Sequence, residues 1–143
     1  MPVRDPDHVT DVIYDASELQ VSINNEEADA SSLCDYQAYS QGEWVREKYA
    51  DHYSDYFHSD YSLIEVRNDE AQAERSLLIV STSLGNPLER LFAENYTCVY
   101  SVDHRHYGGT IEDVLAYHEV DDVLFLMDDN GYTKDEFVEF LGA

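Results

Sequence analysis

The sequence predicts a single small α/β domain of three layers, in which a mostly parallel sheet lies between helices and carries a β-rich extension at its N-terminus. Strand-like apolar segments alternate with helix-like segments through the second half of the chain. Residues 122–127 are apolar after their first position, which is typical of a strand buried in a parallel sheet. A length of 143 residues suits one domain with its own core and is too short for two ordinary ones.

The extension is predicted from the first 40 residues. Residues 10–24 indicate two short strands around a polar turn, and residues 25–40 are small and acidic and indicate an irregular connection. We therefore divide the single domain, residues 1–143, into a hairpin-like extension with its acidic connection (1–40) and an α/β core (41–143).

The core is predicted to begin with a helix over about residues 42–57. At about 100° per residue, its apolar side chains gather on one side, which we expect to face the core. These side chains are Val45, Tyr49, Tyr53, Tyr56 and Phe57.

Strands and helices then alternate to the end of the chain. Pro87 suits the first turn of a helix, Thr110 with Asp113 approximates a capping box, and Thr133 with Glu136 caps a last helix. Since strands joined by helices of this length form right-handed crossovers, a parallel sheet follows. The predicted strands are 61–67, 76–81, 96–102 and 122–127, and the predicted helices are 87–94, one from residue 110 and one from 133 to Gly142.

Charge sets the chain apart, because 31 acidic residues stand against 8 basic ones, for a net charge of -23. Contacts to phosphate need cationic side chains, so we expect no direct binding to nucleic acid or to an anionic membrane. A basic partner, by contrast, would be attracted at a high rate. With no apolar leader at the start and no run of membrane-spanning length, we expect a cytoplasmic protein, in the host cytoplasm if a phage or mobile element encodes it.

The two cysteines, Cys34 and Cys98, are expected to be free thiols in a reducing compartment, Cys98 within an apolar strand. A disulfide between them is the alternative.

A possible nucleophile lies between Leu77 and Phe92, where an apolar strand runs into Ser-Thr-Ser and then into a helix start. Many hydrolases present a serine in this way, and the serine here is Ser83. It needs a base and a group that orients the base. Asp103, His104 and His106 follow the neighbouring strand and would share the same sheet edge, so a triad with Ser83 is geometrically conceivable.

Residues 43–127 resemble the C-terminal part of the DHHW family, SGNH-hydrolase-like proteins associated with O-acetylation of extracellular polysaccharides such as alginate. The resemblance rests on the segment from Ser81-Thr82-Ser83 to the Asn86-Pro87 helix start, on residues 102–107 (VDHRHY) and on residues 120–124 (VDDVL). It implies half of a flavodoxin- or SGNH-like sheet, with Ser83 at the position of the nucleophile.

The resemblance does not extend to the activating groups. In the family these come from an Asp-x-His pair upstream of the serine, and this chain has no Asp-x-His. The family's Gly-Asp-Ser is here Ser81-Thr82-Ser83. We therefore expect no enzyme: Ser83 is a vestigial site, with Asp103, His104 and His106 as weak partners.

No cofactor or metal is expected. If Gly131 were the glycine of an EF-hand loop, Leu126 and Phe137 would stand at its first and last ligand positions. Neither side chain can bind Ca²⁺, so we expect no calcium site here. His104 and His106 could face one Zn²⁺ ion, but no third His or Cys is spaced with them.

The predicted 42–57 helix carries a row of carboxylates at every fourth residue, which we name the acidic stripe: Glu43, Glu47, Asp51 and Asp55. They would lie roughly 6 Å apart, a regular row of negative charge like that of a phosphate strand. Trp44 falls on the same side as a candidate anchor. Further predicted contacts are Asp121, Asp122, Asp128 and Asp129.

From this pattern we predict a non-enzymatic protein that imitates DNA or RNA and blocks the basic groove of a nucleic-acid-binding protein. By analogy, a CRISPR effector is such a target, as for anti-CRISPR inhibitors. Three alternatives remain open: a solvated or salt-adapted surface, an esterase or acetyltransferase using Ser83, and a subunit whose partner chain supplies the missing lobe. The sequence leaves the oligomeric state open.

Overall fold

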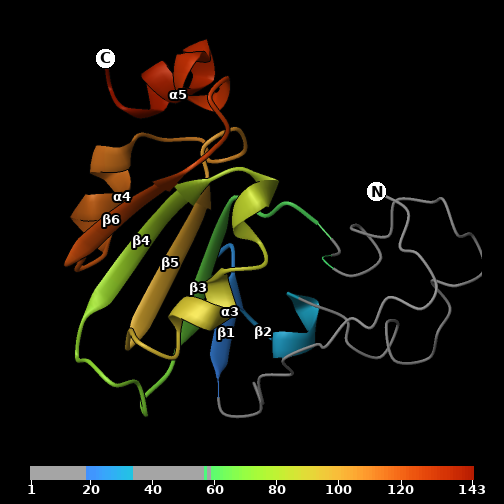
Figure 1. The fold of residues 1–143 in the computed structure, drawn as a ribbon, viewed down its shortest axis with the longest axis vertical. Helices are drawn as coiled ribbons and strands as arrows, with labels where there is room; N and C mark the ends of the chain where they lie inside the picture. The colour runs from blue at the N-terminus through green and yellow to red at the C-terminus, as the bar shows by residue number, and fades with distance from the viewer. Residues whose placement is uncertain (1–18, 34–56, 58) are drawn as a thin grey trace, which may run out of the picture.

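A computed structural model of the chain describes residues 19–33, 57 and 59–143 (Figure 1). Its centre is a six-stranded sheet in the order β2-β1-β3-β5-β4-β6. The strands are β1 (Gln20–Ile23), β2 (Glu26–Ala28), β3 (Leu63–Arg67), β4 (Ser76–Ser81), β5 (Cys98–Asp103) and β6 (Asp122–Leu126).

The predicted α/β class with an N-terminal β-rich extension is confirmed, but the sheet is mixed rather than mostly parallel. β4 pairs in parallel with β5 and with β6, whereas β1–β2, β1–β3 and β3–β5 pair antiparallel. The loop between β3 and β4, residues 68–75, holds no helix. A parallel crossover needs a dozen or more residues, so the chain reverses its direction here instead.

The described part of the extension contains a hairpin whose first strand, β1, lies within the predicted 10–24 segment. The rest of that prediction, residues 10–18, lies outside the described residues. β2 falls inside 25–40, where we expected an irregular connection. The cause is the Asn24-Asn25 turn, whose φ angles of 51° and 66° are both positive. Positive φ at both central residues is what a tight hairpin turn requires, and Asn tolerates it better than most residues.

In the described part of the chain, three short α-helices accompany the sheet: α3 (Glu89–Phe92), α4 (Ile111–Tyr117) and α5 (Asp135–Phe140). The predicted capping box of Thr110 and Asp113 begins α4. The predicted cap of α5 is wrong, because Thr133 ends a 3-10 turn, η4 (Gly131–Thr133), and the capping position falls on Lys134. Gly142, with φ of 78°, follows α5 in the left-handed conformation that often ends a helix.

Helices cover both faces of the sheet, which gives the three predicted layers. On β4, Leu78 and Val80 point to the face that carries Val114 of α4 and the two phenylalanines of α5. Leu77 and Ile79 point to the opposite face, where Ala93 lies at the end of α3. Cys98 is a buried free thiol, as predicted.

The acidic stripe, Trp44 and Cys34 lie outside the described residues, as does nearly all of the predicted 42–57 helix. Among the described residues, no helix is long and apolar enough to cross a membrane.

A test of the packing after β4 is the Gly85→Ala substitution. Gly85 is buried in η3 (Ser83–Gly85), and a Cβ atom there would lie 2.8 Å from the Cβ of Ser81. We expect a loss of about 1–3 kcal/mol in the free energy of unfolding, measured in urea, because the turn must move away from β4. Gly108→Ala is the matched control, since a Cβ there meets no heavy atom within 4 Å. Equal losses in both variants would contradict this account.

Candidate active site

The carboxyl ends of β4 and β5 meet at one edge of the sheet, together with the start of β3 (Figure 1). Ser81 pairs with Asp103 in parallel register, so the chain leaves both strands at the same level. Leu63 pairs with Val102, which brings the segment before β3 to this edge too. Ser83, Asp103, His104 and His106, predicted from the sequence, therefore follow neighbouring strand ends.

Ser83 stands in a tight turn between β4 and α3, as the sequence predicts. Thr82 is extended, with φ of −113° and ψ of −165°, and η3 begins at the next residue. The amide of Gly85 donates to the carbonyl of Thr82 at 2.9 Å, and the amide of Asn86 donates to that of Ser83 at 3.3 Å. Ser83 is half-buried. The chain thus turns away from the sheet directly at this serine.

His104 does not share the face of the sheet that η3 occupies. Its ring is 4% exposed and packs against Phe137 and Phe140, at 5.4 and 6.4 Å between centroids. Its Nδ1 lies 3.0 Å from the carbonyl oxygen of Ser81. A carbonyl oxygen only accepts, so Nδ1 carries the hydrogen and donates it. His104 therefore supports the end of β4 from the α5 side.

Arg105 binds two carboxylates at this edge. Its backbone amide and Nε donate to Asp103 Oδ1 at 3.0 and 2.9 Å, and its Nη2 donates to Asp103 Oδ2 and, at 2.9 Å, to Asp60 Oδ2. The hydrogen bond to Asp103 raises the pKa of Arg105 further above its already high value, despite partial desolvation. Asn86 donates to the other oxygen of Asp60 at 3.2 Å. Asp60 thereby joins the Ser83 turn to the turn after β5.

His106 is the histidine that lies beside these carboxylates. It is exposed, and one of its ring nitrogens lies within 4.8 Å of a carboxylate oxygen of Asp60 and of Asp103. A histidine next to a carboxylate can act as an oriented base. The same three groups could bind a divalent cation, but the Arg105 guanidinium already binds both carboxylates.

Glu89 is buried behind the Ser83 turn, and the sequence analysis missed it. It is 2% exposed, and its side chain hydrogen-bonds Ser101 of β5. Burial raises its pKa to about 8, and the charge of Asp60 contributes in the same direction. The sequence held one indication that Glu89 is buried. Glu89 lies four residues before Ala93, so both fall on the same face of α3, and that face is buried.

Three of the four described acids predicted to bind a partner also hold loops together. Asp121 accepts from the amide of Ser76 at 2.8 Å, and this backbone hydrogen bond lowers its pKa. Asp122 accepts from Arg75 at 2.8 Å and from the hydroxyl of Tyr96 at 3.1 Å. The other two are Asp128, which accepts from the amide of Gly131, and Asp129, which is exposed.

No protein-family model matches the sequence, and no curated protein matches it. Its structure is similar to that of Bacillus cereus PatB1 with a sulfonyl adduct, at 27% identity and a TM-score of 0.55 over 59% of this chain and 29% of that one. A second structure of PatB1 gives 20% identity and a TM-score of 0.65 over 82% of this chain and 38% of that one. A DHHW family protein from Eubacterium siraeum gives 20% identity and a TM-score of 0.50 over 77% of this chain and 34% of that one.

This chain therefore shares its fold with part of PatB1 and with part of a DHHW family protein. The matched region spans roughly a third of the length of each of them, between 29% and 38%.

The buried carboxyl group of Glu89 predicts a pH-dependent stability. An unfolded Glu releases its proton near pH 4.5, whereas the folded protein keeps it until about pH 8. The folded state therefore binds more protons in this window, and its stability falls as the pH rises from 4.5 to 8, by up to about 1.4 kcal/mol per pH unit. Glu89→Gln keeps the shape and a hydrogen-bonding group but removes the titration.

We expect the free energy of unfolding of Glu89→Gln to exceed that of the parent protein by a margin that grows across this window. Urea unfolding at several pH values measures this margin. Glu94→Gln, which changes an exposed acid just after α3, is the control. A margin for Glu89→Gln that does not vary with pH would show that this carboxyl group does not hold its proton.

Proposed function

We propose that this chain carries a serine acyl-transfer site of the SGNH-like type and acts as an esterase or acetyltransferase through Ser83. The observation that supports this most is the position of Ser83, in the tight turn that follows the central parallel strand β4. The fold around it is similar to that of PatB1, one structure of which bears a sulfonyl adduct. Sulfonyl compounds with a leaving group, such as sulfonyl fluorides, form such adducts with nucleophilic side chains.

Each residue of the site has one role in the proposed reaction. The Oγ of Ser83 attacks the acyl carbon of an ester, and His106 takes the hydroxyl proton. The C–O bond to the alcohol then breaks, and the alcohol leaves with that proton. Water or an acceptor hydroxyl next attacks the acyl-serine and restores the free Ser83. His106 is preferred to His104 because it is exposed beside Asp60 and Asp103, whereas His104 is enclosed by α5.

This arrangement replaces the base that the DHHW pattern takes from its upstream Asp-x-His. Asp60 is the better candidate to orient His106, because it also bonds Asn86 in the turn that follows Ser83. Asp103 is buried and gives both of its oxygens to Arg105, whereas Asp60 is exposed and gives Arg105 only one.

The proposal predicts that phenylmethylsulfonyl fluoride labels Ser83. Intact-mass and peptide spectra should show one sulfonyl group per chain, on the peptide that contains Ser83, and Ser83→Ala should abolish it. His106→Gln should slow the labelling by about 10²–10⁴-fold, because it removes the base. Ser22→Ala, in β1, is the matched serine control and should label normally.

Each result of this experiment has a defined meaning. If the folded protein leaves Ser83 unlabelled, Ser83 is vestigial and the acyl-transfer proposal fails. If labelling of Ser83 is insensitive to His106, the assigned base is wrong and another group must take the proton.

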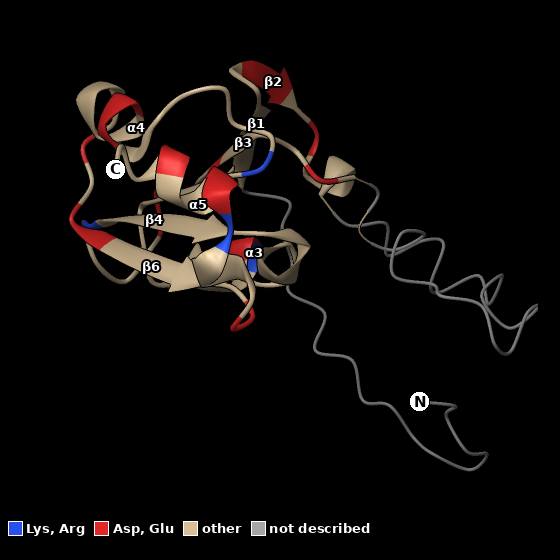
Figure 2. Cartoon of the chain, turned by 90° about the horizontal axis from the view of Figure 1, so that it is seen from above, with Lys and Arg blue, Asp and Glu red and all other residues tan. Residues whose placement is uncertain are grey.

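A second candidate function is the one predicted from charge, an acidic protein that occupies the basic groove of a DNA- or RNA-binding protein. The net charge of -23 favours it. Figure 2 shows acidic residues on β2, α4 and α5 and basic residues at few positions. Three of the described arginines, Arg67, Arg75 and Arg105, are ion-paired with acids, so they add little free positive charge.

For this candidate, the double reversal Glu47→Lys and Asp51→Lys tests the acidic stripe. A pull-down from nuclease-treated lysate of a host with an active CRISPR system should capture one nucleic-acid-binding complex, displaced by added DNA or RNA and by salt. The double variant should then associate with that complex at least about tenfold more slowly. An unchanged rate would count against the stripe, and a capture indifferent to salt and nucleic acid would count against mimicry.

A further inference from the structure

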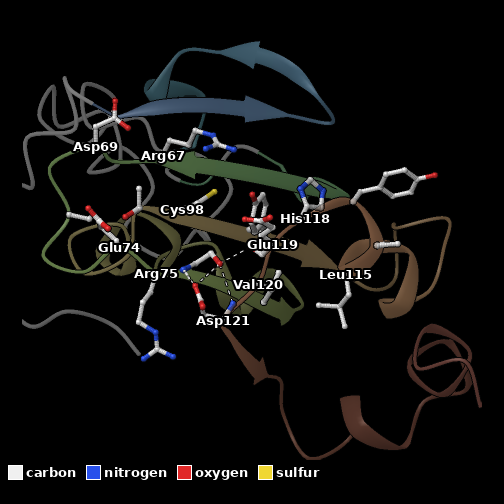
Figure 3. A pocket seen from close by; sticks show the side chains of 16 residues that line it. Arg67, Asp69, Glu74, Arg75, Cys98, Leu115, His118, Glu119, Val120 and Asp121 are labelled. Carbon is white, nitrogen blue, oxygen red and sulfur yellow. Dashed lines mark hydrogen bonds between the residues drawn. The ribbon is translucent and has the colours of Figure 1, made fainter.

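A groove of about 1390 Å³ lies at the amino ends of β4 and β5, at the opposite edge of the sheet from Ser83 (Figure 3). One wall comes from the loop between β3 and β4, and the other comes from the end of α4 and the residues that follow it. Cys98 and Tyr100 of β5 lie between these walls. None of its lining residues belongs to the candidate active site.

The charges of the groove leave it negative. Arg67 pairs with Glu65 and Arg75 pairs with Asp122, so both guanidinium groups are already neutralised. Four carboxylates line its walls, all of them exposed, and among the described residues no ion pair engages them. Asp121 accepts a hydrogen bond from the amide of Ser76, and the other three are Asp69, Glu74 and Glu119.

Aromatic rings accompany these carboxylates. His118 stacks on Tyr100 with 4.3 Å between ring centroids. Tyr117, the last residue of α4, lines the groove and is 82% exposed, and Leu115 of the same helix is 44% exposed. An exposed aromatic ring beside carboxylates is the combination that binds a guanidinium or ammonium group, since the ring face adds a cation–π attraction.

Charge decides between the possible occupants. A second copy of this chain carries the same net charge of -23, and its own segments 1–18 and 34–56 hold more acids than bases. A second copy and these segments are therefore negative like the groove and do not complement its charge. A typical small-molecule site is roughly 300–1,000 Å³ and mostly apolar, whereas this groove is larger and polar. We propose that it binds an extended arginine- or lysine-bearing peptide segment of a partner protein.

Basic side chains of that segment pair with Glu74 on one wall and with Glu119 on the other. One of these basic side chains lies over the ring of Tyr117. The binding does not rest on acyl transfer, because it needs neither Ser83 nor His106. It also supplies the predicted basic partner with a surface that does not include the acidic stripe. Exposed ion pairs are screened by salt, so the affinity should fall as the ionic strength rises.

The probe is a fluorescein-labelled peptide of alternating arginine and glycine, titrated with the full chain and followed by anisotropy. Glu74→Gln with Glu119→Gln should weaken binding at least about tenfold at physiological salt. Glu136→Gln with Glu139→Gln removes the same charge from exposed positions of α5 and should weaken it less than about twofold. Tyr117→Ala leaves the net charge unchanged and should weaken it about threefold.

Equal losses in the two double variants would overturn the proposal, because general attraction to an acidic surface would then explain the binding. A peptide that does not bind the parent protein at physiological salt would overturn it as well. Ser83→Ala provides a separate reference: it should bind the peptide normally whether or not Ser83 reacts with a sulfonyl fluoride, so the two proposals fail independently.

Discussion

The parallel pairing of β4 with β5 is the constraint on which the rest of the structure depends. It sets Ser81 level with Asp103, so the Ser83 turn and the turn that carries His106 leave the sheet side by side. A slip of one residue would move the side chains of β5 to opposite faces and carry Asp103 and Arg105 together away from Asp60. The register is secured by burial, because every residue of β5 and all but the first of β4 are buried.

The sequence predicted the strands from β3 to β6 closely, because their apolar runs are bounded by polar turns. It could not predict that β3 lies beside β5, because strand order depends on long-range pairing that no local pattern records. The same limit applies to the site. The turn at Ser83 has a local signal, whereas Asp60 becomes part of the site only through Arg105 and Asn86, 45 and 26 residues away.

The high acidity of the chain is tolerated partly because many carboxylates accept hydrogen bonds from backbone amides. The hydrogen bond from the backbone amide of Thr110 lowers the pKa of Asp113 at the start of α4. Hydrogen bonds from the side chain and the amide of Ser31 lower the pKa of Asp29. Glu89 is the opposite case, since burial holds its proton in place. β6, the last strand of the sheet, is flanked by Asp121 and Asp129, and charges beside an edge strand discourage pairing with other chains. Acidity alone is therefore weak evidence for mimicry.

The two proposed sites use opposite ends of the same strands. β5 contributes Asp103 at one end and Cys98 and Tyr100 near the other, and a six-residue strand spans roughly 20 Å. That distance exceeds the Debye length of about 8 Å at physiological salt, so exposed charges at one site have little direct electrostatic effect on the other. Any coupling between them would have to pass through β4 and β5, which both reach from the groove to the edge that carries Ser83. Since β5 and all but the first residue of β4 are buried, a peptide in the groove would alter the reactivity of Ser83 only by shifting these strands.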